Sequence, residues 1–183
     1  MEVGIILFER RTMKRRYIVI FLFLTLSSLL IFILYPRKLK DSDDFIKKAR
    51  TVIPISDAQT VMIDYAGMVI EHSDALMWFI SGNENQEHYY LPMECSINND
   101  GTYTYCTTYE PIIRADDVGV AYWKNGYCFL VNNPKCKYIR IRKQSGQEIE
   151  VEINKYPYIY NSDDIPREYV FLDSNKKELP FSE

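Results

Sequence analysis

Two adjacent aspartates, Asp116 and Asp117, form a residue pair whose types and spacing suggest acid–base catalysis. Paired carboxylates at a suitable separation hydrolyse glycosides, one acting as the acid and the other as the base or nucleophile. Aspartates are also common in solvated turns, and these two lie in a connecting segment. The pair is therefore the candidate site of a hydrolase, with a plain turn as the alternative.

No other catalytic or cofactor motif is present. The two histidines, His72 and His88, flank predicted strands or turns, which favours surface or capping roles for them. The sequence lacks serine-hydrolase and zinc-protease motifs and both nucleotide-binding glycine patterns. The stretch 98–101 carries oxygens that suit calcium but not the spacing of a calcium loop. We expect neither a cofactor nor a bound metal.

The cysteines are candidates for disulfide bonds, because all of them follow the apolar segment described below and none forms a C-x-x-C pair. They are Cys95, Cys106, Cys128 and Cys136. Four cysteines allow three pairings, of which Cys95–Cys106 is the most local. If Asp100-Gly101 is a two-residue hairpin loop, these two face each other with Cα atoms about 5.5 Å apart. Buried free thiols are the alternative.

Tyrosines are concentrated in two stretches that could form a contact surface. Tyr103 and Tyr105 alternate with threonine in one, and Tyr156 and Tyr158 flank a proline in the other. Exposed tyrosines make adaptable contacts because each combines an apolar ring with a polar hydroxyl. Packing inside a β-rich core is the alternative for each of them.

The elements that must position these residues begin after an apolar segment, Tyr17–Tyr35. Its nineteen residues include no charge, proline or glycine. As a helix it is about 28 Å long, close to the hydrocarbon thickness of a bilayer. No small-residue cleavage site follows, which favours an uncleaved anchor over a signal peptide or a buried core helix. We expect a single transmembrane helix whose partner is the lipid bilayer.

Flanking charges predict the orientation of this helix. Five Lys and Arg residues precede it and three follow it before the acids begin, so the N-terminus is expected in the cytoplasm. Met13 starts a compact signal-anchor sequence, which suggests that residues 1–12 are an extension from an alternative start. No Asn-x-Ser/Thr acceptor occurs, which favours a bacterial cell membrane over a eukaryotic secretory route.

Charge differs sharply between the two ends of the chain. Residues 1–40 carry eight Lys/Arg and two Glu, a formal charge of +6. Residues 41–183 carry fourteen Lys/Arg and twenty-three Asp/Glu, a formal charge of -9. Nucleic-acid binding needs a basic surface, so this acidic portion is not expected to bind DNA or RNA.

The remainder of the chain reads as strands. A short helix is predicted over 41–50, and from residue 59 short apolar runs alternate with turn signals. The run 75–81 is continuous and apolar, typical of a strand buried on both faces, whereas Pro92 places the run 89–97 at an edge or bulge. Asn125-Gly126 is interpreted as a hairpin turn, and residues 111–117 and 155–168 as connectors.

One hairpin can be predicted in register. With 144–146 as a three-residue loop, Ile141 faces Ile149 and Arg142 faces Glu148. A slip of one residue would place arginines opposite isoleucines, so this register is preferred.

We therefore predict four segments: a cytoplasmic stretch (1–16), a transmembrane helix (17–35), a juxtamembrane linker with a short helix (36–58) and an extracytoplasmic domain (59–183). The domain is expected to be all-β, an antiparallel sandwich or barrel of about eight or nine strands, with α+β as the alternative. The expected function is a membrane-anchored binding module for a protein or glycan outside the cell. The alternative is an extracytoplasmic hydrolase that uses Asp116 and Asp117.

Overall fold

The structure is a computed structural model that describes residues 20–27, 38–55, 59–82, 88–114 and 117–180. The chain divides into two compact units, residues 1–37 and residues 38–183. In the first unit residues 20–27 are helical. Among the described residues, no helix has the length and apolar character needed to cross a bilayer. Most of the predicted segment Tyr17–Tyr35 lies outside the described residues.

The second unit is predominantly β, as predicted, and its strands form three antiparallel sheets. The helix-side sheet has the order β1-β2-β3-β4, with β5 also pairing β3; its strands are β1 (Ile63–Glu71), β2 (Asp74–Ser81), β3 (His88–Ile97), β4 (Tyr103–Thr108) and β5 (Ile112–Arg114). The middle sheet has the order β10-β7-β6, made of β10 (Tyr158–Asn161), β7 (Gly126–Val131) and β6 (Val118–Trp123). The outer sheet has the order β11-β8-β9, made of β11 (Glu168–Leu172), β8 (Tyr138–Arg142) and β9 (Glu148–Glu152).

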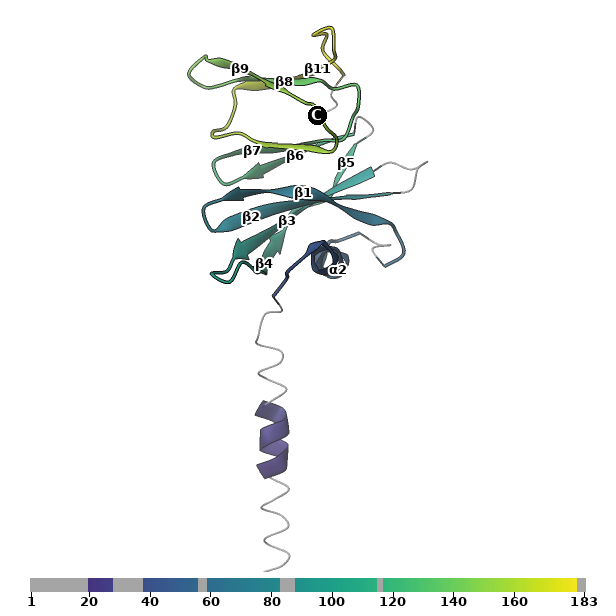
Figure 1. Cartoon of the computed structure of the whole chain (residues 1–183), viewed down its shortest axis with the longest axis vertical. Helices are drawn as coiled ribbons and strands as arrows, with labels where there is room; N and C mark the ends of the chain where they lie inside the picture. The colour runs from purple at the N-terminus through teal and green to yellow at the C-terminus, as the bar shows by residue number, and fades with distance from the viewer. Residues whose placement is uncertain (1–19, 28–37, 56–58, 83–87, 115–116, 181–183) are drawn as a thin grey trace, which may run out of the picture. The chain divides into compact units, whose positions relative to one another are not determined.

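The sheets are stacked as successive layers, with helix α2 (Ser42–Val52) on the far side of the helix-side sheet (Figure 1). Three hydrophobic clusters fill the spaces between these layers. One joins α2 to the helix-side sheet, one joins that sheet to the middle sheet, and one joins the middle sheet to the outer sheet. The middle sheet is consequently packed on both faces, which explains why β7 is almost entirely apolar.

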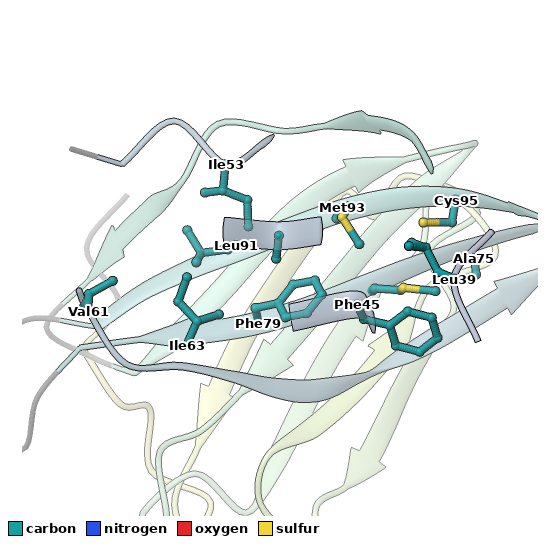
Figure 2. Close-up of a cluster of buried hydrophobic side chains, with 12 residues drawn as sticks. Leu39, Phe45, Ile53, Val61, Ile63, Ala75, Phe79, Leu91, Met93 and Cys95 are labelled. Atoms are coloured by element: carbon teal, nitrogen blue, oxygen red, sulfur yellow. The ribbon is translucent and has the colours of Figure 1, made fainter. Parts of the chain in front are cut away.

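Helix α2 begins at the cap residue Asp41, whose side chain accepts a hydrogen bond from the Asp44 backbone N–H. Phe45 and Ala49 are buried against the sheet, and their spacing of four residues places them on one helix face. Phe45 belongs to the same cluster as β-strand side chains such as Phe79 and Met93 (Figure 2). The segment predicted as a linker therefore contributes to the core of the domain.

The chain is fastened to the helix-side sheet before α2 begins. Leu39 and Tyr103 form an antiparallel bridge with two hydrogen bonds, each 2.8 Å from N to O. Leu39 is also buried in the helix-side cluster (Figure 2). This bridge extends the exposed edge of β4 and ties residue 39 to the domain.

The prediction that 75–81 is a strand buried on both faces is confirmed by β2, where Ala75–Phe79 are fully buried. Pro92 differs from expectation, because β3 is a central strand with β2 on one side and β4 and β5 on the other. The Pro92 carbonyl accepts from the Tyr109 N–H, where the chain passes from β4 to β5. The missing donor of proline therefore falls in the gap between those two partner strands.

The predicted register of the β8–β9 hairpin is confirmed: Ile141 pairs with Ile149 and Arg142 pairs with Glu148. The loop closes through a hydrogen bond from the Lys143 N–H to the Gln147 carbonyl, 2.8 Å long. Gly146 has φ +86°, the left-handed conformation expected at this position.

The predicted register of the β3–β4 hairpin is wrong by one residue. Asn98 and Thr102 close a three-residue loop in which Gly101 has φ +75°, and Cys95 pairs with Tyr105 instead of Cys106. Cys106 lies in a bulge of β4 and is exposed, whereas Cys95 is buried under α2 (Figure 2). The predicted disulfide is absent, and all four cysteines are free thiols.

These thiols should differ in reactivity in the folded protein. Burial raises the pKa of Cys95 and Cys128 to about 12 and that of Cys136 to about 11, so their reactive thiolate forms are scarce near neutral pH. We expect a maleimide at pH 7 to label only the exposed Cys106 quickly, and all four thiols after denaturation without reductant. Intact mass spectrometry counts the adducts, and fewer than four after denaturation would contradict this arrangement.

Three connections differ from the sequence prediction. In the β6–β7 hairpin Trp123 pairs with Gly126, so the turn consists of Lys124 and Asn125, and Gly126 belongs to β7. The predicted connectors 111–117 and 155–168 contain the short strands β5 and β10. The described residues therefore form eleven strands instead of eight or nine.

Candidate functional site

Asp117 is held at the start of β6 by two side chains of β3. Its Oδ1 accepts a hydrogen bond from the hydroxyl of Tyr90 at 2.9 Å and lies 3.0 Å from His88 Nδ1. An ionised carboxylate only accepts hydrogen bonds, so this contact requires the proton on Nδ1 of His88. Tyr90 is fully buried, whereas the side chains of His88 and Asp117 are about one-third exposed at 31% and 37%.

This arrangement is a His–Asp dyad, which leaves His88 Nε2 available as a hydrogen-bond acceptor or base. In such a dyad the carboxylate orients the imidazole and stabilises its protonated form, while Nε2 takes a proton from water or another nucleophile. Asp117, one of the two predicted aspartates, therefore has a partner of suitable chemistry. Asp116, the other, lies outside the described residues.

The sequence interpretation of His88 as a surface or capping residue missed this contact. His88 and Asp117 are 29 residues apart and share no local motif. Pairing of β3 with β5 sets His88 opposite Arg114, only three residues before Asp117 in the chain.

An open hollow of about 310 Å³ lies beside this dyad. It is lined by residues of β1, β2 and β3 and by residues next to β7 and β10, including Met62, Asp64, Ile80, His88, Asn132 and Pro157. It therefore lies where one end of the helix-side sheet meets the middle sheet. Its volume is at the lower end of the range of about 300–1,000 Å³ typical of ligand pockets.

A second polar cluster joins the same two sheets at the other end of β6. Lys124 Nζ lies 2.5 Å from Asp74 Oδ2 and 3.2 Å from Glu94 Oε1, and Tyr109 donates to Glu94 Oε2 at 2.7 Å. The hydrogen bond to Asp74 is the main cause of the raised pKa of Lys124. Burial, followed by the bond to Glu94, raises the pKa of Tyr109. Each charged side chain of this cluster has a partner within it, so the cluster serves to hold the two sheets together.

The four tyrosines predicted as a contact surface are all half-buried. Tyr103 packs edge-on against Phe45 of α2, and Tyr105 lies under Lys48, whose Nζ is 4.1 Å from the ring centroid. Tyr156 donates a hydrogen bond to the Cys136 carbonyl, and Tyr158 packs on the cluster between the middle and outer sheets. Each therefore contributes part of its ring to packing and keeps part of its surface accessible.

Within the described ranges, no three His, Cys, Asp or Glu side chains are grouped closely enough to hold a metal ion. The fold defines a β-rich domain of three stacked antiparallel sheets with one packed helix. The chain matches no protein-family model, no curated protein and no solved structure.

Proposed function

We propose that this protein is a single-pass membrane protein whose β-rich, sandwich-like domain is a binding module outside the cytoplasm. The short basic N-terminus is cytoplasmic in this proposal, and the segment Tyr17–Tyr35 spans the lipid bilayer. The partner is a protein or glycan on the outer side of a bacterial membrane.

The observation that supports the anchor best is the character of the helical residues 20–27. Every large apolar side chain described there is exposed, at 54–70%. These residues are Ile20, Phe21, Leu22, Phe23, Leu24 and Leu26. A helix that is apolar on all sides needs lipid or another apolar environment around it, since water would otherwise contact each of these side chains.

The binding role is supported by the hollow between the helix-side and middle sheets. Its lining combines the apolar Met62, Ile80 and Pro157 with polar groups of Asp64, His88 and Asn132. A concave surface that mixes apolar walls with a few polar groups is the usual form of a ligand site.

Fractionation of cells that express the full chain with a tag at each end tests this proposal. We expect the protein in the membrane fraction, resistant to alkaline carbonate and released by detergent. Protease added to spheroplasts should remove the C-terminal tag and spare the N-terminal one. A variant with Leu24→Arg and Leu26→Arg should lose membrane retention, because each arginine costs about 2.5–3.5 kcal/mol at the centre of a span. Wild-type protein in the soluble fraction would contradict the anchor.

The contact between His88 and Asp117 favours one second candidate, an extracytoplasmic hydrolase. In this function His88 Nε2 removes a proton from an attacking water, and Asp117 orients the imidazole through the 3.0 Å contact at Nδ1. We expect Asp117→Asn to lower hydrolysis of a responsive nitrophenyl ester or glycoside by about 100-fold or more, since general-base catalysis supplies about 10²–10⁴-fold. The exposed Asp163→Asn is the control, and equal rates for both variants would contradict the hydrolase.

A further inference from the structure

We propose that the hollow beside His88 binds the cationic side chain of a lysine or arginine presented by a peptide or protein partner. This inference rests on the binding-module function proposed above and names the chemistry that the module recognises.

Asp64 provides the charge for this recognition. It lies on β1, is exposed and is the one carboxylate among the described residues that line the hollow. In the part of the chain that the structure describes, its side chain forms no ion pair or hydrogen bond. By contrast, acids on the other sheets such as Glu148 and Glu150 already pair with arginines. Asp64 is therefore available to a charged group from outside the chain.

The walls suit the aliphatic stem of a basic side chain. Along β1, Ile63 and Tyr65 pack in the cluster under α2, whereas Ala66 packs toward the middle sheet. Because side chains alternate along a strand, Met62 and Asp64 point away from the side of Ile63 and Tyr65, and both line the hollow together with Ala66. Met62 is 57% exposed and lines the hollow. Lysine and arginine bury their methylene groups on such surfaces while the charged head reaches a carboxylate.

The polar groups of the hollow complete a site for a donor-rich head. Asn132 offers an amide oxygen as an acceptor, and His88 offers Nε2 because Nδ1 is engaged by Asp117. A guanidinium or ammonium group carries only donors, so acceptors on two sides match it.

The net negative charge of the whole domain also favours a cationic partner. Residues 41–183 carry a formal charge of -9, which attracts cationic partners and repels acidic ones during encounter. The same field could attract any basic peptide weakly, so the test must separate this general attraction from binding at Asp64.

NMR titration of the full chain in detergent micelles provides that separation. The probe is the peptide Gly-Gly-Arg-Gly-Gly, and its neutral counterpart carries citrulline in place of arginine. We expect saturable shift changes at amides that line the hollow, such as those of Asp64, Ile80 and Asn132. We expect the citrulline peptide to bind at least about tenfold more weakly than the arginine peptide. Such a loss is typical of removing a charge-assisted hydrogen bond.

The matched variants are Asp64→Asn and Glu152→Gln, which remove one negative charge each from exposed strand positions. We expect Asp64→Asn to weaken binding about tenfold and Glu152→Gln to change it less than twofold. Equal weakening by both variants, equal binding of both peptides, or shifts confined to other surfaces would overturn this site. Shifts elsewhere would leave the binding-module function standing, and fractionation tests the membrane anchor independently.

Discussion

Replacing Trp78 by alanine is expected to lower the free energy of unfolding by about 3–5 kcal/mol, the usual loss when a buried large aromatic is truncated. Trp78 is fully buried between the helix-side and middle sheets, and its Nε1 lies 3.2 Å from Cys128 Sγ. Its ring also fills the space beside Gly119, where an added Cβ would lie 2.9 Å from Cζ3. The indole therefore contacts both strands of the β6–β7 hairpin, and its loss leaves a cavity between two layers.

Urea denaturation followed by near-ultraviolet circular dichroism measures this loss. Tyr122→Ala is the control, because Tyr122 is an aromatic residue of the same middle sheet with 53% of its surface exposed. We expect that control to cost less than about 1 kcal/mol. Similar losses for the two variants would show that the two sheets are not packed through Trp78.

The second large effect is expected at Gly126. A Cβ added there would overlap the backbone carbonyl of Ser162 and lie 2.8 Å from Ser162 Oγ. Ser162 and Tyr127 are held together by a 2.9 Å hydrogen bond from the Ser162 N–H to the Tyr127 carbonyl, and by a 2.8 Å hydrogen bond from the Tyr127 N–H to Ser162 Oγ. Backbone cannot move aside as a flexible side chain can, so Gly126→Ala should destabilise the fold by about 3 kcal/mol, the upper part of the usual range for overpacking.

Gly101→Asn is the matched control for that substitution. Gly101 has no heavy atom within 4 Å of an added Cβ, and its φ of +75° is one that asparagine tolerates. We expect a change below about 1 kcal/mol in the same denaturation assay. If Gly126→Ala were equally mild, the close approach of residues 161–163 to β7 would be contradicted.

Two hairpins show what the sequence could and could not predict. Both have three-residue loops that end in a glycine of positive φ, Gly101 in one and Gly146 in the other. The β8–β9 register was predictable because apolar and charged residues alternate on both strands. Only one alignment pairs apolar residues with each other and arginines with glutamates. In β4 threonine and tyrosine alternate, either of which suits both faces of a sheet. There the length of the loop alone decides the register. The prediction assumed a two-residue loop, which shifted every predicted pair by one residue.

The short strands β5 and β10 carry too little local signal to be predicted. They have three and four residues, and each lies near a proline that suggests a connector. Each is ordered by a longer neighbouring strand, β3 for β5 and β7 for β10. Their existence therefore depends on the completed sheets and not on their own composition.

The candidate site was predictable only in part. The acidic connector indicated Asp117, because carboxylates in loops are the usual material of acid–base sites. Its partners His88 and Tyr90 come from β3, three strands before β6 in chain order, and nothing near Asp117 identifies them. Asp64 carried no signal at all, since its significance comes from the hollow that the two sheets form around it.

The bridge between Leu39 and Tyr103 has a mechanical consequence. Any tension transmitted along the chain from residues before Lys38 reaches the ion pair of Lys38 with Asp100 and these two 2.8 Å hydrogen bonds before it reaches the rest of the domain. After these contacts break, the force acts on α2, which packs against the sheet through the buried Phe45 and Ala49. Detachment of this helix would expose to water the face of the helix-side sheet that holds Cys95, and it would leave the middle and outer sheets packed together. The domain is therefore expected to unfold in steps under force.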